Sequence, residues 1–358
     1  MRPVYSAKLK PYQMQSVHAK GACTRPGRQA TRTPGFTLAC VFATAVLLPV
    51  PATAQRPADG YPTRAVTVIV PFAAGAVTDL ETRLYAQKLT ELTGRTFVVD
   101  YKPGAGSMIG TASVARAAPD GYTLLVATPS LSIAPLLHKN LGFDPINDFT
   151  FVSMVSKRAP LLLATPSLPV KNVVEYIAYA RANPGKLNIG TSGSTGGAHL
   201  SMEWLHHSTN TKATFIHYKG GAHSFTALMA GEVHVAVGSL IAMMGNVRAG
   251  KAKILGVTSA ERVKILPDIP TVAEQGVPGF EYAPWLGFAV PRSTPAAIVA
   301  PLNAELVKVA RTPELAERLA DDATLMIGST PEQFALAVSA EAARWRKLVD
   351  ETGMKLEQ

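Results

Sequence analysis

The stretch VTVIVPFAAGAVTDLETRLYAQKL, residues 66–89, predicts a strand that runs through a glycine-containing turn into a helix. Its strand part, the apolar run 65–72, is rich in β-branched residues, which is typical of a strand buried on both faces. The letters TDLE match a capping box, in which the Thr78 side chain accepts from the backbone N–H of Glu81 and the Glu81 side chain bonds back to Thr78. At helical spacing, the following residues predict an apolar face toward the sheet: Leu80, Leu84, Tyr85, Leu89 and Leu92.

The turn itself, AAGA at residues 73–76, contains no Arg, Lys or His and no pair of catalytic groups. Its small residues leave the backbone N–H groups at the helix start open to approach, and these groups have no partner within the helix. They also lie at the positive end of the helix dipole, so a carboxylate can bind there without a cationic side chain. One such turn taken alone is more often an ordinary corner that binds nothing.

Two further turns have the same character. Residues 187–205, LNIGTSGSTGGAHLSMEWL, run from a strand through small residues into an amphipathic helix and add hydroxyl groups to the backbone donors. Residues 101–115, YKPGAGSMIGTASVA, also follow a strand. Several Gly- and Ser-rich turns of this kind in one protein predict loops that converge on one anionic ligand.

Short apolar runs alternate with helical patterns along most of the chain. The predicted strands are AVTVIVPF, TFVVDYK, YTLLVAT, FTFVSMV, PLLLATP, KLNIGTS, ATFIHY, VHVAVGS, KILGVTS and WLGFAVP. Helices are predicted at 173–183, 198–207 and 225–230, and residues 295–356 are predominantly helical, with PEQF as one helix start. This alternation predicts an α/β protein with mostly parallel sheets, in two lobes with a ligand cleft between them.

Residues 1–54 are predicted to be a signal peptide. A basic stretch ends near Arg32, the apolar run FTLACVFATAVLLPV follows, and PATAQ provides small residues before cleavage near Ala54/Gln55. The apolar run is too short for a membrane span of about 20 residues. The basic region is long for a signal, so translation starts at Met1 or at Met14. We therefore expect the mature protein in the periplasm.

Composition limits the function further. With 47% hydrophobic and 17% charged residues, the 358-residue chain is expected to be a soluble globular protein of about two domains. Of the net charge of +10, seven positive charges lie in residues 1–54, which leaves +3 for the body and predicts no nucleic-acid partner. Cys23 and Cys40 both precede Gln55, which excludes a disulfide, a thiolate nucleophile and a cysteine metal site from the mature chain.

Four motifs that suggest catalysis or cofactors are weak. GNVRAGKA at 245–252 has the spacing of a phosphate loop but ends in alanine, and GAGSMIG at 104–110 lacks the acidic residue that a dinucleotide site needs. GTSGS lacks the second glycine of a serine-hydrolase motif. His199, Glu203 and His206 have the spacing of zinc ligands, or else His199 bonds locally while the other two are solvated. We expect no catalytic residue, no metal and no cofactor.

Several stretches together resemble the Bug/TctC family of periplasmic solute-binding proteins, the receptors of tripartite tricarboxylate transporters. The stretches are YPTRAVTVIVPFAAGAVTD, YKPGAGSMIG, APDGYTLLVAT, YARANPGKLNIGTSG, HYKGGAHSFTALMAGEVHV, VRAGKAKILGVTSAERVKILPDIPTVAEQGVPGFE and TPEQF. The resemblance runs from about Tyr61 to the C-terminus. It implies a type II periplasmic-binding-protein fold, in which two α/β lobes close over a small carboxylate that is held largely by main-chain groups.

The resemblance also implies the ligand-binding residues. In lobe one these are Phe72, Ala74, Gly75, Ala76 and Asp79, with Thr128 and Ser130. In lobe two these are Ser192, Gly193, Ser194 and Thr195, with His199 at the helix start and Tyr218. Lobe one is expected at 60–160 plus 283–358 and lobe two at 161–282, so that the chain crosses twice between them.

This chain departs from the family pattern at several positions. The family usually has glycine in place of Ala76 and Ser107, asparagine in place of Tyr101, proline in place of His217 and aspartate in place of His234. Alanine makes a positive φ at residue 76 less favourable. The two histidines are expected near the cleft, where they add positive charge at low pH. These departures bear on the choice of ligand.

The sequence thus predicts a monomeric, non-enzymatic receptor for a small carboxylate, an organic acid or an amino acid, that serves a membrane transporter. Two alternatives remain open at this point. One is an orphan receptor that serves a sensor protein. The other is a secreted metal-dependent hydrolase that uses His199, Glu203 and His206.

Overall fold

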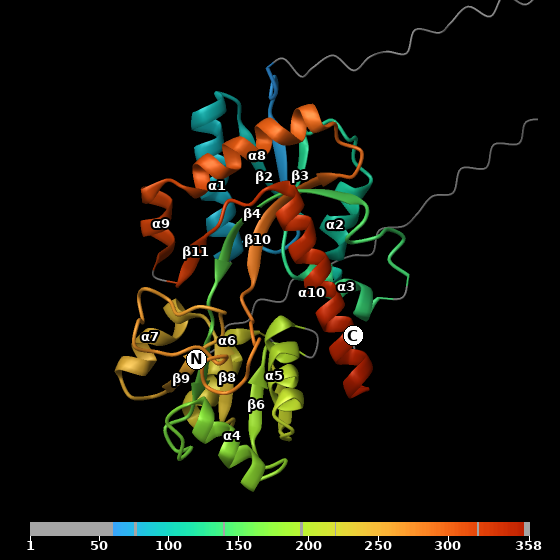
Figure 1. Cartoon of the computed structure of the whole chain (residues 1–358). Helices are drawn as coiled ribbons and strands as arrows, with labels where there is room; N and C mark the ends of the chain where they lie inside the picture. The colour runs from blue at the N-terminus through green and yellow to red at the C-terminus, as the bar shows by residue number, and fades with distance from the viewer. Residues whose placement is uncertain are drawn as a thin grey trace, which may run out of the picture. The chain divides into compact units, whose positions relative to one another are not determined.

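Two separate β-sheets organise the protein, and Figure 1 shows the elements that surround them. The computed structural model describes residues 60–74, 77–138, 140–193, 196–218, 220–320 and 322–353. The predicted signal peptide lies outside the described residues, as do Gly75, Ala76, Ser194 and Thr195.

The first sheet has six strands. Their order is β11 (Thr324–Met326), β4 (Phe149–Arg158), β10 (Trp285–Pro291), β3 (Thr123–Ala127), β1 (Val66–Val70) and β2 (Phe97–Tyr101). Strand β1 pairs in parallel with β2 and β3, whereas β10 and β11 pair in an antiparallel manner with their neighbours. The carboxyl ends of β1 and β3 therefore meet at one edge of the sheet.

The second sheet has five strands. Their order is β7 (Thr214–His217), β6 (Asn188–Thr191), β8 (Val235–Gly238), β5 (Leu161–Ala164) and β9 (Lys253–Val257). Strand β6 runs parallel to β7 and β8, and β5 is antiparallel to β8 and β9. The prediction of mostly parallel sheets was therefore wrong, because antiparallel strands with helices on both faces show the same near-continuous apolar runs.

Helices cover both faces of each sheet. Those next to the first sheet are α1 (Val77–Thr93), α2 (Met108–Ala115), α3 (Ser130–Leu137), α8 (Ala296–Ala310), α9 (Pro313–Ala320) and α10 (Pro331–Thr352), with the short 3₁₀ helix η1 (Ala105–Ser107) before α2. Those next to the second sheet are α4 (Val173–Ala182), α5 (Gly197–Ser208), α6 (Gly221–Ala230) and α7 (Leu240–Arg248). In β1, Val68 belongs to the core under α1 and α8, and the next residue, Ile69, belongs to the core under α10. This alternation places buried side chains on both faces of one strand.

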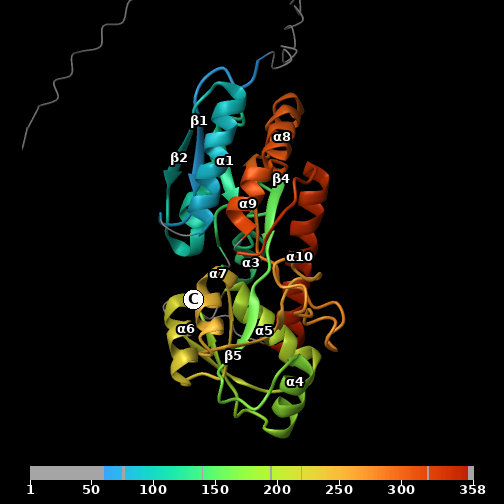
Figure 2. The same cartoon turned by 90° about the vertical axis from the view of Figure 1, so that its left-hand side faces the viewer.

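The chain crosses between the sheets twice, at residues 159–160 and again between β9 and β10. Figure 2 shows β4 running from the first sheet toward the second, where β5 begins. The two crossings lie side by side, because the backbone N–H of Thr258 donates to the carbonyl of Pro160 at 2.9 Å and that of Tyr282 donates to the carbonyl of Thr258 at 2.7 Å. These bonds join the two crossings into one connection.

The predicted start of α1 needs correction. The helix begins at Val77, so Thr78 lies inside it, and Glu81 is fully buried and bonds to Ser156 and Arg158 of β4. The predicted apolar face is only partly buried, since Leu84, Tyr85 and Leu89 are buried but Leu80 and Leu92 are exposed. The Glu81 side chain thus ties α1 to strand β4 and does not form the predicted capping box.

Helix α10 starts as the sequence predicts. The Thr330 side chain accepts from the backbone N–H of Gln333 at 3.2 Å, and the Gln333 side chain accepts from the N–H of Thr330 at 3.0 Å. This is a complete capping box, and Pro331 occupies the first helical position. Among the described helices, none is long and apolar enough to cross a membrane.

Candidate functional site

The turn after β1 is held in place by α2. A side chain at Gly110 would approach the carbonyl of Lys102 to 2.7 Å and the Cα atom of Pro71 to 2.9 Å, so only glycine allows this packing. Phe72 is half-buried against the core of the first sheet, and Ala74 is exposed. The predicted residues Gly75 and Ala76, which complete the turn, lie outside the described residues.

Asp79 is buried in the first turn of α1, and its carboxylate is occupied by protein groups. Arg83 Nε donates to it at 2.7 Å, and the hydroxyl of Tyr101 donates to the same oxygen. The carboxylate therefore ties the end of β2 to α1. The oxygens of Asp79 already accept from two side chains, and Asp79 lies beside the turn after β1. This supports a role for Asp79 in positioning that turn.

A cluster of three hydroxyls lies where β3 ends. Ser107 Oγ donates to Ser130 Oγ at 2.8 Å, and Ser130 Oγ lies 3.0 Å from Thr128 Oγ1. The structure thus brings the predicted residues Thr128 and Ser130 together and adds Ser107, which the sequence reasoning did not assign to the site. Ser107 has a φ of 82°, a left-handed conformation that favours glycine. The glycine-rich turn around it was the signal that could have placed it there.

Within the described residues, no side chain caps the start of α5, which follows the turn after β6. Gly193 has a φ of +127°, no atom of the described residues lies within 4 Å of where its side chain would be, and Ser192 is exposed. The N-cap residue is Gly196, which has no side chain to accept from the first N–H groups of α5. Gly197 packs against Tyr282, because a side chain at Gly197 would approach the Tyr282 ring to 2.7 Å. The predicted residues Ser194 and Thr195 lie outside the described part of the turn.

His199 lies behind this turn and is neutral near pH 7. Burial, and after it the nearby His217, lowers the pKa of His199 to about 4. Its ring packs edge-on at 4.7 Å from Phe215 and 5.0 Å from His217, measured between ring centres. Its Nδ1 atom is buried and has no hydrogen-bond partner within the described residues. An unsatisfied buried nitrogen is unfavourable, so this atom is available to a ligand or a water molecule.

Among the other lobe-two residues expected near the ligand, Tyr218 and His217 lie beside the turn after β6, whereas His234 does not. The backbone of Tyr218 bonds to Thr191 at 2.9 Å, which places Tyr218 beside the turn after β6, and His217 directly precedes it. The expectation that His234 lies near the cleft was wrong. Its Nδ1 atom accepts from the backbone N–H of Asn188 at 2.9 Å, at the amino ends of β6 and β8 and hence at the opposite edge of the sheet from Thr191.

The zinc-like pattern on α5 does not form a metal site. No group of three potential ligands that could hold a metal occurs within the described residues. His206 is buried and uses both ring nitrogens, with Nε2 at 2.8 Å from the Tyr176 hydroxyl and Nδ1 at 2.7 Å from Thr211 Oγ1. The expectation that His206 is solvated was wrong, because the sequence spacing does not show that α5 turns this face toward α4.

His206 should make stability depend on pH. Burial lowers its pKa to about 4, so between pH 6.5 and 4 the unfolded chain binds a proton that the native protein does not. We expect the stability of the wild-type protein to fall, relative to a His206→Gln variant, by about 2 to 3 kcal/mol between pH 7 and pH 4.5. Urea unfolding at both pH values measures this difference. Parallel losses in the two proteins would contradict a neutral, buried His206.

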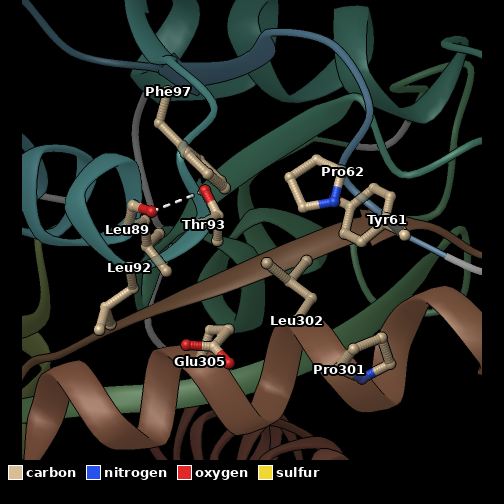
Figure 3. A pocket seen from close by; sticks show the side chains of 10 residues that line it. Tyr61, Pro62, Leu89, Leu92, Thr93, Phe97, Pro301, Leu302 and Glu305 are labelled. Carbon is tan, nitrogen blue, oxygen red and sulfur yellow. Dashed lines mark hydrogen bonds between the residues drawn. The ribbon is translucent and has the colours of Figure 1, made fainter.

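One hollow beside the first sheet lies away from these turns. It has a volume of about 300 Å³ and is lined by α1, α8 and the segment before β1 (Figure 3). Phe97 at the start of β2 and Tyr61 before β1 place it at the amino ends of the parallel strands. Ligands of open α/β sheets bind at the carboxyl ends, so this hollow is not our candidate site.

Comparison with known proteins fits this arrangement. Residues 82–354 match the family model described as "Tripartite tricarboxylate transporter family receptor". The chain belongs to this family. Its fold is the predicted one, two α/β lobes of the type II periplasmic-binding-protein kind, and each sheet with its helices is the body of one lobe.

Three relatives of the receptor show the extent of the similarity. Protein BugT of Bordetella pertussis is 32% identical over 84% of this chain and 92% of its own. The solved structure of R. palustris Rpa4515 with adipate is 37% identical, with a TM-score of 0.71 over 82% of this chain and 98% of that one. MatC (Rpa3494) from Rhodopseudomonas palustris with bound malate is 32% identical, with a TM-score of 0.67 over 81% and 100% of the two chains.

Proposed function

We propose that this receptor captures a small carboxylate between the turn after β1 and the turn after β6. The observation that carries the proposal is the start of α5, where the N-cap residue is glycine and the buried Nδ1 of His199 has no partner among the described residues. Backbone N–H donors at a helix start favour an anion. Adipate and malate, the ligands named for two of its solved relatives, are both small carboxylic acids.

The energy of such a site is adequate without a cationic side chain. Four or five hydrogen bonds to a charged group contribute about 6–15 kcal/mol in total, at about 1.5–3 kcal/mol each. Ordering the ligand and the turns offsets part of this. The remainder is compatible with the ~8 kcal/mol of a micromolar complex.

We also propose how the lobes act. Lobe one comprises 60–160 and 283–358, lobe two comprises 161–282, and the hydrogen-bonded crossings at Pro160, Thr258 and Tyr282 form the hinge. Closure over the carboxylate presents a changed surface to a membrane partner. We infer that the mature protein is exported to the periplasm, works as a monomer without catalysis, and delivers its ligand to transporter subunits; a sensor protein is the second candidate partner.

A proline substitution tests the site. The φ of Gly193 is +127°, which proline cannot adopt, so Gly193→Pro moves the turn after β6. We expect adipate and malate to raise the melting temperature of the wild-type protein, as a bound ligand does by mass action, and not that of Gly193→Pro. Gly250→Pro is the matched control, because Gly250 also has a positive φ, of 70°, and lies in the turn between α7 and β9, outside both crossings.

The outcome separates the possibilities clearly. Stabilisation that persists in Gly193→Pro would remove the turn after β6 from the site. A wild-type protein that no small carboxylate stabilises, in a screen that also includes amino acids and aromatic acids, would overturn the proposed function itself.

A further inference from the structure

His217 lies at the outer end of the candidate site. It is the last residue of β7, the edge strand of the second sheet, and it is in register with Thr191, the last residue of β6. The turn that carries Gly193 begins directly after Thr191. The His217 side chain is exposed, so it borders the proposed ligand site on the side away from the crossings at β5.

Hydrogen bonds orient the imidazole of His217. Thr191 Oγ1 donates to the carbonyl of Gly193 at 3.2 Å and lies 2.7 Å from His217 Nδ1. The Thr191 hydroxyl thus occupies Nδ1 of His217, in either tautomer of the imidazole. The edge-on contact with the His199 ring, at 5.0 Å, holds the same orientation. The atom left for a ligand is Nε2.

The chemistry of Nε2 depends on what binds. A carboxylate accepts from Nε2–H, which an imidazole carries either as the neutral Nε2–H tautomer or as the protonated ring. His199, whose ring touches His217, stays neutral near pH 7 because burial lowers its pKa to about 4, and its Nε2 lies 3.8 Å from Glu203 Oε1. His199 therefore adds no positive charge beside His217.

We propose that His217 makes this receptor selective for dicarboxylates. This inference rests on the proposed function, in which the first carboxylate lies between the two turns. A ligand that extends outward from the turn after β6 reaches the end of β7, where Nε2 of the imidazole donates to the second carboxylate. A charge-assisted bond of this kind strengthens binding by about tenfold or more.

Matched ligands and variants test the proposal. The probes are adipate against hexanoate and succinate against butyrate, which differ by one carboxylate at equal chain length. His217→Asn keeps a donor for Thr191 but lacks Nε2, and His217→Phe keeps a ring but has no nitrogen. His223→Phe is the control, because His223 is an exposed histidine in the first turn of α6.

Calorimetric titration gives the affinity ratio of each pair. We expect the wild-type protein and His223→Phe to bind the dicarboxylate of at least one pair at least tenfold more tightly, and both His217 variants to lose that preference while they still bind the monocarboxylate. Equal affinities in the wild-type protein, or a preference that survives in both His217 variants, would overturn the role of His217 and leave the carboxylate site standing. No binding of any of the four acids to the wild-type protein would overturn this inference.

Discussion

Replacing Arg158 with methionine is expected to lower the free energy of unfolding by about 3 to 5 kcal/mol. Arg158 Nη2 donates to Glu81 Oε2 at 2.7 Å, and Glu81 is fully buried. Burial raises the pKa of Glu81, and Arg158 and Ser156 oppose that rise. Without the guanidinium, a buried carboxylate remains without its partner charge, and this unpaired charge destabilises the folded state. Urea unfolding at pH 7 measures the loss.

The control and a second variant identify the cause. Arg318→Met removes an exposed pair with Glu314 and should change stability by about 0.5 kcal/mol or less. The double variant Glu81→Leu, Arg158→Met removes both charges and should be more stable than Arg158→Met alone. In Arg158→Met, Glu81 has a raised pKa in the native state, so its protonation makes that variant relatively more stable as the pH falls from 8 to 5. Additive losses in the double variant would contradict the explanation by a buried charge.

This ion pair shows where sequence reasoning reached its limit. The spacing of Thr78 and Glu81 fits a capping box, but Ser156 and Arg158 of β4 bond to the Glu81 carboxylate instead. Whether Glu81 bonds to Thr78 or to β4 depends on the position of β4, which lies far away in the sequence and packs on α1 only in the folded protein. Local pattern recognises the residue types that a helix start prefers, and tertiary contacts decide what they bond to.

The strands were predicted well where local signals were strong. Nine of the ten predicted apolar runs each contain a whole strand, and the tenth, FTFVSMV, covers the first seven residues of β4. The eleventh, β11, has three residues and exists because it pairs with β4, so its own sequence carries almost no signal. Strand direction was also beyond local reasoning, since β4 and β10 pair antiparallel only because the chain returns from the second sheet.

The candidate site was predictable in part for the same reasons. Glycine-rich turns after strands are local, and the turns at Gly193 and around Ser107 both carry positive φ values. The burial of His199 and His206 was not predictable, because it depends on how α5 packs against β7 and α4. The position of His234 at the opposite sheet edge follows from the register of β6 and β8, which a single sequence does not reveal.

Replacing Trp345 with alanine is expected to destabilise the protein by about 3 to 5 kcal/mol. Trp345 of α10 is 1% exposed and belongs to a cluster with Ile133 of α3 and Leu200 of α5. Figure 1 shows the lower part of α10 beside α3 and α5, and the Trp345 ring meets that of Trp204 on α5 edge-on at 6.3 Å. The cluster therefore joins helices of both lobes, and its loss leaves a cavity that three helices must share.

The size of the loss follows from the volume removed. An alanine at position 345 leaves the void of a whole indole, whereas Trp345→Phe keeps a ring in the same space and should lose about half as much or less. Leu336→Ala is the control on the same helix, since Leu336 is 70% exposed and its truncation removes little buried surface. Urea unfolding of the three variants should rank them Trp345→Ala, Trp345→Phe, Leu336→Ala from the largest loss to the smallest. Removing an indole from a filled core site costs more than about 1.5 kcal/mol. A smaller loss for Trp345→Ala would therefore mean that α10 does not pack between the lobes as its buried face indicates.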